Sequence, residues 1–93
     1  MIRSFADKET ERIWLGERSR RLPHAVQDVG LRKLRIINRV ASLEELRSPP
    51  GNQLERLERD RKGQWSIRIN GQWRICFRWE KGETHDVEIV DYH

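Results

Sequence analysis

The last three residues of this 93-residue chain, Asp91, Tyr92 and His93, can each carry or orient a proton. They come directly after an apolar stretch that has the pattern of a strand, at a place where chains are commonly disordered. In a regular strand Asp91 and His93 would point to one face and Tyr92 to the other. The strand end must therefore splay if all three are to meet one substrate. From the pattern alone, the simpler interpretation is a frayed terminus with an ordinary tyrosine packed on the sheet.

Arginines form the second group of residues with chemical potential. Of the 19 basic side chains, 15 are arginine and 4 are lysine, and the formal net charge is +4. A guanidinium binds phosphate through two N–H groups and stacks on bases, so this bias suits nucleic acid, although ordinary surface ion pairs would also account for it. The candidates for an RNA-binding surface are Arg56, Arg59, Arg61, Lys62, Arg68 and Arg78.

Metal, thiol and nucleotide-cofactor chemistry is not indicated. The three histidines, His24, His85 and His93, lack the spacing of a metal-ligand set. The one cysteine, Cys76, lies inside an alternating stretch without a partner nearby, which favours a small buried side chain over a nucleophile. No glycine-rich phosphate loop and no serine-hydrolase or zinc-protease motif occurs. We therefore expect no metal and no cofactor.

The elements that must position these residues begin with two helices. Residues 2–5 have the pattern of a short edge strand, after which Ser4 or Asp7 caps a helix that runs to about Leu15 and stops at Gly16. The basic connection 16–24 has Leu22 as its only apolar anchor, and we expect it to be mobile. A second helix is predicted over residues 25–41, since apolar or small residues recur there at helical spacing: Val26, Val29, Gly30, Leu34, Ile37 and Ala41.

Strands follow in the second half of the chain. The run SPPGN at residues 48–52 excludes a helix or an inner strand, and from there the pattern changes to alternation over residues 64–69, 72–79 and 85–92. We therefore predict an α+β fold, in which two N-terminal helices pack on an antiparallel meander. No linker or repeat interrupts the sequence, so residues 1–93 are expected to form a single domain.

The Asn70-Gly71 turn offers a choice of strand register. A two-residue loop would place Ile67 beside Arg74, whereas a three-residue loop with Gly71 at positive φ pairs Ile67 with Trp73. The second register is favoured because it collects the apolar side chains on one face. The opposite face then carries three arginines, Arg68, Arg74 and Arg78.

That second face has two interpretations. It is either a cradle for RNA phosphates or a solvated surface whose arginines are paired with acidic neighbours. The acidic residues available for such pairing are Glu80, Asp86 and Glu88, of which Asp86 is expected to lie across from Arg78.

Three segments in order resemble a known family: RSPPGNQLERL, then GQWSIRINGQWRICFRW, then the terminal DVEIVDYH. Together with the start MIRSF, they are similar to the HigB branch of the RelE-like toxins, and particularly to the GraT-type plasmid-maintenance killer proteins. The resemblance covers essentially the whole chain. It implies a compact α+β RNase fold, ribosome-dependent mRNA cleavage, and neutralisation by a helix-turn-helix antitoxin of the HigA or GraA kind. Operator DNA would be met only indirectly, through that antitoxin.

The resemblance also implies a site. The family's C-terminal Asp-Tyr-His and the arginine of its W-R-I strand correspond to Asp91, Tyr92, His93 and Arg74. Better-known members carry a His and a Lys ahead of the W-S-I strand, where this chain has Glu55 and Glu58. Glu55 is thus a possible replacement base, or equally an exposed salt-bridge partner, and the base stays unassigned. The implied reaction uses no metal: a 2′-OH attacks its own 3′-phosphate, which Arg74 would bind while His93 carries a proton.

Two other functions are compatible with the same residues. The chain would be a non-catalytic RNA- or ribosome-binding module if only the basic face were used, or a protein-binding partner if Arg35, Arg39 and the 18–21 segment met an acidic surface. No apolar run approaches the ~20 residues that a membrane span needs. We therefore expect a cytoplasmic protein without a membrane partner.

Overall fold

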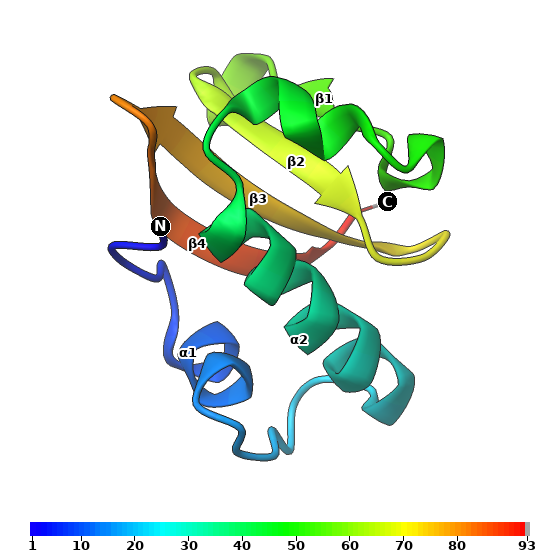
Figure 1. Cartoon of the computed structure of the whole chain (residues 1–93). Helices are drawn as coiled ribbons and strands as arrows, with labels where there is room; N and C mark the ends of the chain where they lie inside the picture. The colour runs from blue at the N-terminus through cyan, green and yellow to red at the C-terminus, as the bar shows by residue number, and fades with distance from the viewer. Residues whose placement is uncertain (93) are drawn as a thin grey trace.

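A computed structural model describes residues 1–92, which form two helices and a four-stranded antiparallel sheet. Figure 1 shows α1 (Lys8–Trp14) and α2 (His24–Arg39) packed on the same face of the sheet. The strands lie in the order β1 (Glu55–Arg56), β2 (Gln64–Arg68), β3 (Trp73–Glu80) and β4 (Glu83–Asp91). Three short 3-10 turns, η1 (Leu43–Arg47), η2 (Pro50–Asn52) and η3 (Arg59–Arg61), link α2 to β2. The predicted α+β fold is confirmed.

Local sequence accounts for the bounds of the helices. Asp7 caps α1, because its carboxylate accepts a hydrogen bond from the Thr10 backbone N–H at 2.8 Å. Gly16 follows the helix at φ +82°, a conformation that glycine adopts without steric cost. The second helix ends at Arg39, two residues before the predicted end, and Ala41 is exposed rather than part of its buried face.

The core lies between the helices and the sheet. Gly30 of α2 lets the helix approach β4 closely, since a Cβ there would lie 3.3 Å from Ile89 Cδ1. Residues 2–5, predicted as an edge strand, run beside β4 through two isolated parallel bridges, Ile2–Thr84 and Phe5–Val87. The largest fully buried apolar side chains of this core are Phe77, Leu34, Ile37, Leu46, Ile67 and Ile75.

The predicted register of β2 and β3 is wrong by two residues. Ile67 pairs with Ile75 rather than with Trp73. The side chain of Asn70 closes the turn, since its Oδ1 accepts from the backbone N–H groups of Gln72 at 2.8 Å and Trp73 at 2.9 Å. Because side chains alternate with a period of two, a shift of two residues leaves each one on its predicted face.

The connection between the helices has a polar anchor that the sequence analysis missed. Gln27, buried in α2, accepts from the Ser19 backbone N–H at 3.0 Å. Its amide nitrogen donates to the carbonyls of Ser19 at 2.9 Å and Leu22 at 2.7 Å. The segment expected to be mobile is thus tied to α2 by three hydrogen bonds. Within residues 1–92, no helix is long and apolar enough to span a membrane.

Candidate active site

Arg74 lies in β3 on the sheet face opposite the helices, and only 8% of its surface is exposed. Its Nε donates to Ser66 Oγ at 2.7 Å, and its Nη2 donates to the backbone carbonyl of Gln53. Among the described residues no carboxylate lies within ion-pair distance of Arg74, and Nη1 has no hydrogen-bond partner. Neutral oxygens therefore orient the guanidinium without neutralising it, which is costly for a buried charge unless a ligand supplies the anion.

The turn before β1 supplies one of these oxygens. Pro50 prevents a regular strand, and the turn Pro50–Asn52 is followed by Gln53 at φ 46°, in the left-handed region. Asn52 is buried, and its amide nitrogen donates to the carbonyls of Leu46 at 3.2 Å and Ser48 at 3.3 Å. This network holds the turn so that the Gln53 carbonyl faces Arg74.

Of the described C-terminal residues, Tyr92 approaches Arg74 from the end of β4. The Tyr92 backbone N–H donates to the Gln72 carbonyl at 2.7 Å, which prolongs the pairing of β4 with β3. The Tyr92 ring centre lies 6.0 Å from the guanidinium carbon of Arg74, within the range of a cation–π contact. Asp91 is paired with Trp73 in the sheet and accepts a hydrogen bond from Gln72 Nε2 at 3.0 Å. His93, the fourth candidate, lies outside the described residues.

Glu55 lies in β1 directly opposite Ser66, the residue that holds Arg74 Nε. Cross-strand partners share a face, so Glu55 belongs to the same face as Arg74. Its side chain is exposed, and within residues 1–92 it has no cation at ion-pair distance, so the salt-bridge interpretation finds no partner there. Glu58 is exposed as well, at the start of η3.

The predicted RNA-binding residues fall into two groups. Arg61 is paired with Glu88 at 3.2 Å, and Arg78 contacts Glu80 at 3.4 Å and Asp86 at 3.8 Å, so both are partly neutralised. The others have no carboxylate at ion-pair distance within the described part of the chain: Arg56, Arg59, Lys62 and Arg68. The uncompensated charge is therefore contributed by β1, the end of β2 and the turn containing η3.

The centre of this face is buried rather than solvated. Ser66 and Cys76 are paired across β2 and β3, and both are fully buried. Burial raises the pKa of the Cys76 thiol, and this effect exceeds the influence of Arg61 and Glu88 nearby. A thiol with a raised pKa is a poor nucleophile, in agreement with its interpretation as a small core residue. Among residues 1–92, no group of three histidine, cysteine or acidic side chains is arranged to hold a metal.

Lys33 of α2 is the main residue near this site that sequence reasoning missed. Its Nζ donates to Arg68 O at 2.6 Å and to Asn52 Oδ1 at 3.0 Å. Burial lowers the pKa of Lys33, and the charges of Arg32, Arg68 and Arg74 lower it further. The one local signal is its position next to Leu34 of the core stripe, where a charged residue must emerge at the helix margin.

A separate hollow of about 410 Å³ lies on the helical side of the sheet, between α1 and the connection that follows it. It is lined by Glu9, Arg12, Arg18, Arg20 and Arg21. Within residues 1–92, Arg12 and Arg18 contact carboxylates, of Glu9 and Asp28 among others, whereas Arg20 and Arg21 do not.

Comparison with known proteins matches residues 3–93 to the family described as RelE-like toxin of type II toxin-antitoxin system HigB. Toxin HigB-1 of Vibrio cholerae is 39% identical over 83 residues, which cover 88% of this chain and 87% of that protein. Endoribonuclease HigB of Proteus vulgaris is 39% identical over 41 residues, 44% of this chain and 45% of that protein. The solved YoeB-YefM complex from Staphylococcus aureus matches with a TM-score of 0.58 at 18% identity, over 100% of this chain and 95% of that one.

Proposed function

This chain belongs to the HigB family of RelE-like toxins of type II toxin-antitoxin systems, and we propose that it is a ribosome-dependent mRNA endoribonuclease. One observation carries the proposal. Arg74 is nearly buried, is oriented by neutral oxygens of Ser66 and Gln53, and lies against Tyr92, which supports an anion-binding site beside Tyr92. The name of the Proteus vulgaris relative, an endoribonuclease, supports the reaction class.

The proposed reaction is an internal transfer of the RNA phosphate. The 2′-oxygen forms a bond to the adjacent phosphorus while the bond to the 5′-oxygen of the next nucleotide breaks, leaving a 2′,3′-cyclic phosphate and a 5′-hydroxyl. Arg74 places Nη1 on the equatorial oxygens, where negative charge accumulates in the transition state. The Tyr92 ring stacks on a base or orients a phosphate oxygen beside Arg74.

Two proton transfers complete the reaction, one from the attacking 2′-OH and one to the leaving 5′-oxygen. His93 is the proposed carrier of one of them, since imidazole titrates near neutral pH, and Asp91 orients it or accepts a hydrogen bond from the nucleotide. Glu55 is the candidate for the second. Its support is its place opposite Ser66 and the absence of a cation at ion-pair distance within residues 1–92.

The proposed dependence on the ribosome is supported by how few of the candidate catalytic side chains are held in a fixed orientation on this face. Arg74 is buried and oriented, whereas Glu55 and Tyr92 are exposed. A substrate held in one pose by the ribosome would supply the missing orientation. We therefore expect purified toxin to cleave an mRNA on translating ribosomes at least ~100-fold faster than the same RNA free in solution. Equal rates on the two substrates would contradict ribosome dependence.

Growth arrest provides a second test in cells. Induced expression of Arg74→Ala or His93→Ala should relieve the arrest while each protein remains folded, because each removes one proposed catalytic group. Mapping of mRNA 5′ ends in the same cultures distinguishes cleavage from simple occupation of the ribosome. If His93→Ala arrests growth as strongly as the wild type without cutting mRNA, the chain is instead an RNA- or ribosome-binding module.

We further propose that a helix-turn-helix antitoxin neutralises this cytoplasmic toxin, which acts as a single domain over residues 1–93. The family assignment to a toxin-antitoxin system supports a protein partner, and so does the resemblance in fold to a chain solved in the YoeB-YefM complex. Co-expression with the candidate antitoxin should restore growth and yield a stable complex. Operator DNA should be retained only by that complex and not by the isolated toxin.

A further inference from the structure

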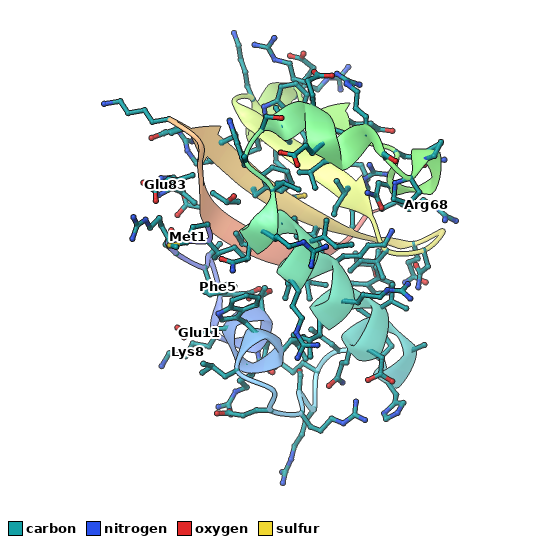
Figure 2. All side chains as sticks on the ribbon, viewed as in Figure 1. Met1, Phe5, Lys8, Glu11, Arg68 and Glu83 are labelled. Carbon is teal, nitrogen blue, oxygen red and sulfur yellow. The ribbon has the colours of Figure 1, made fainter. Side chains whose placement is uncertain are left out.

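Three basic side chains lie close together at the end of the sheet where β2 stops: Lys33, Arg68 and Arg74. Arg68 is paired with Arg74 across β2 and β3, and the Lys33 amine is hydrogen-bonded to the Arg68 carbonyl at 2.6 Å. Figure 2 labels Arg68 at this edge of the sheet. Within residues 1–92, none of these three basic residues has a carboxylate at ion-pair distance. These three positive charges therefore have no protein counter-ion in the described part of the chain.

The Lys33 amine is oriented rather than free to swing. It donates to Asn52 Oδ1 at 3.0 Å, and the amide of Asn52 is fixed because its nitrogen donates to two backbone carbonyls, of Leu46 and Ser48. An ammonium has three N–H groups, so two serve Asn52 and Arg68 and one is left for a ligand. Lys33 is half-buried, so this third donor can reach solvent or a bound molecule.

One turn of chain sets the relative position of two cations. The side chain of Asn52 holds Lys33, and the next residue, Gln53, holds Arg74 through its carbonyl. Both acceptors are neutral oxygens, so neither contact supplies a counter-charge to its cation. Burial and the neighbouring Arg32, Arg68 and Arg74 lower the pKa of Lys33, which is the response of an ammonium short of an anion. A phosphate placed beside Lys33 would relieve this repulsion.

We propose that Lys33 binds a backbone phosphate of the RNA substrate adjacent to the phosphate held by Arg74. Lys33 would thus be a substrate-binding residue that α2 contributes to a site otherwise built on the opposite face of the sheet. The inference rests on the proposed function, because it takes RNA as the ligand. A purely structural Lys33, which only ties α2 to Asn52 and to the end of β2, is the interpretation to be tested against it.

The first experiment measures binding of full-length toxin variants to ribosomes programmed with an mRNA whose A-site codon carries 2′-O-methyl riboses and resists cleavage. Lys33→Met should weaken ribosome binding by about tenfold at moderate salt. In a plot of the logarithm of the binding constant against the logarithm of the salt concentration, it should also reduce the slope by about 0.7, the value for one phosphate contact to a single strand. Lys33→Arg should keep the wild-type slope. The matched control is Lys8→Met, an equal loss of charge on α1, where Figure 2 labels Lys8 far from Arg68.

The salt dependence of binding distinguishes a phosphate contact by Lys33 from a purely structural role. If Lys33 only ties α2 to Asn52 and to the end of β2, Lys33→Met should have the same salt slope as Lys8→Met. This result would overturn the inference. If wild-type toxin does not bind the programmed ribosome at all, the proposed function fails instead. The two failures are therefore distinguishable.

A second measurement uses the wild-type protein and is independent of how well Lys33→Met folds. Lysine side chains are acetylated briefly with and without the programmed ribosome, and mass spectrometry quantifies each site. RNA should protect Lys33 by at least about fivefold while leaving Lys8 unprotected, because a phosphate-bound amine stays protonated and unreactive. Equal labelling of Lys33 in the free and bound protein would exclude the contact.

Discussion

Replacement of Arg74 by lysine tests whether the toxin uses the planar fork of the guanidinium or only its charge. In the wild type, Nε is held by Ser66 and Nη2 by Gln53, which among residues 1–92 leaves Nη1 for the proposed phosphate contact. A lysine has a single nitrogen and cannot satisfy both oxygens while also presenting a donor in that direction. Loss of one oriented donor to a developing oxyanion costs about 3–4 kcal/mol, so cleavage should slow by about 10²- to 10³-fold.

The same change should leave the protein folded. Each neutral acceptor that loses its arginine N–H gives up about 1 kcal/mol, so Arg74→Lys should destabilise the fold by about 1–2 kcal/mol. That is a minor part of the ~5–15 kcal/mol typical of a small domain, and it corresponds to a fall in Tm of roughly 4–16 °C. Thermal unfolding followed by circular dichroism checks this expectation.

The assay is single-turnover cleavage of ribosome-bound mRNA with toxin in excess, so that the rate reports the chemical step. Arg35→Lys is the matched control, since Arg35 is exposed on α2 and the substitution is chemically the same. If folded Arg74→Lys cleaves within about threefold of the wild type and of this control, phosphate binding through the oriented Nη1 of Arg74 is refuted.

The pKa of Lys33 is lowered in the folded state, so at alkaline pH the unfolded chain binds more protons there than the folded chain does. The stability of the wild type relative to Lys33→Met, measured by urea unfolding, should therefore rise with pH as the solution approaches the ordinary lysine pKa of about 10.4, and a falling difference would contradict the sign. Tyr92→Phe keeps the ring against Arg74, so its cleavage rate should stay within about threefold of the wild type. Tyr92→Ala removes the ring, and its cleavage rate in the single-turnover assay should fall about tenfold or more. Equal rates for the two variants would argue against stacking. Gly30→Ala should change the free energy of unfolding by less than about 1 kcal/mol, since the gain in helix propensity offsets the 3.3 Å approach of the new Cβ to Ile89. Gly30→Leu should lower it by about 1–3 kcal/mol, as measured by thermal unfolding. A stable Gly30→Leu would show that α2 does not need this close contact.

Much of the fold is readable from the sequence because its determinants are local. The helical stripe of α2 and the alternation of β2 and β3 repeat within a few residues, and each repeat selects one element type. The register of β2 and β3 was predicted two residues out, since Asn70 rather than Gly71 governs the turn. The error is harmless to the assignment of faces, because it equals one full period of the strand.

The sequence by itself determines which side of the sheet carries Arg74, since alternation requires no knowledge of distant contacts. Only the tertiary structure decides how that guanidinium is held and what surrounds it. Ser66, Gln53 and Lys33 join the site through hydrogen bonds between residues 8, 21 and 35 positions apart, respectively. No periodicity relates such positions, because the turn at residues 50–53 and the packing of α2 against the sheet bring them together only once the chain has folded.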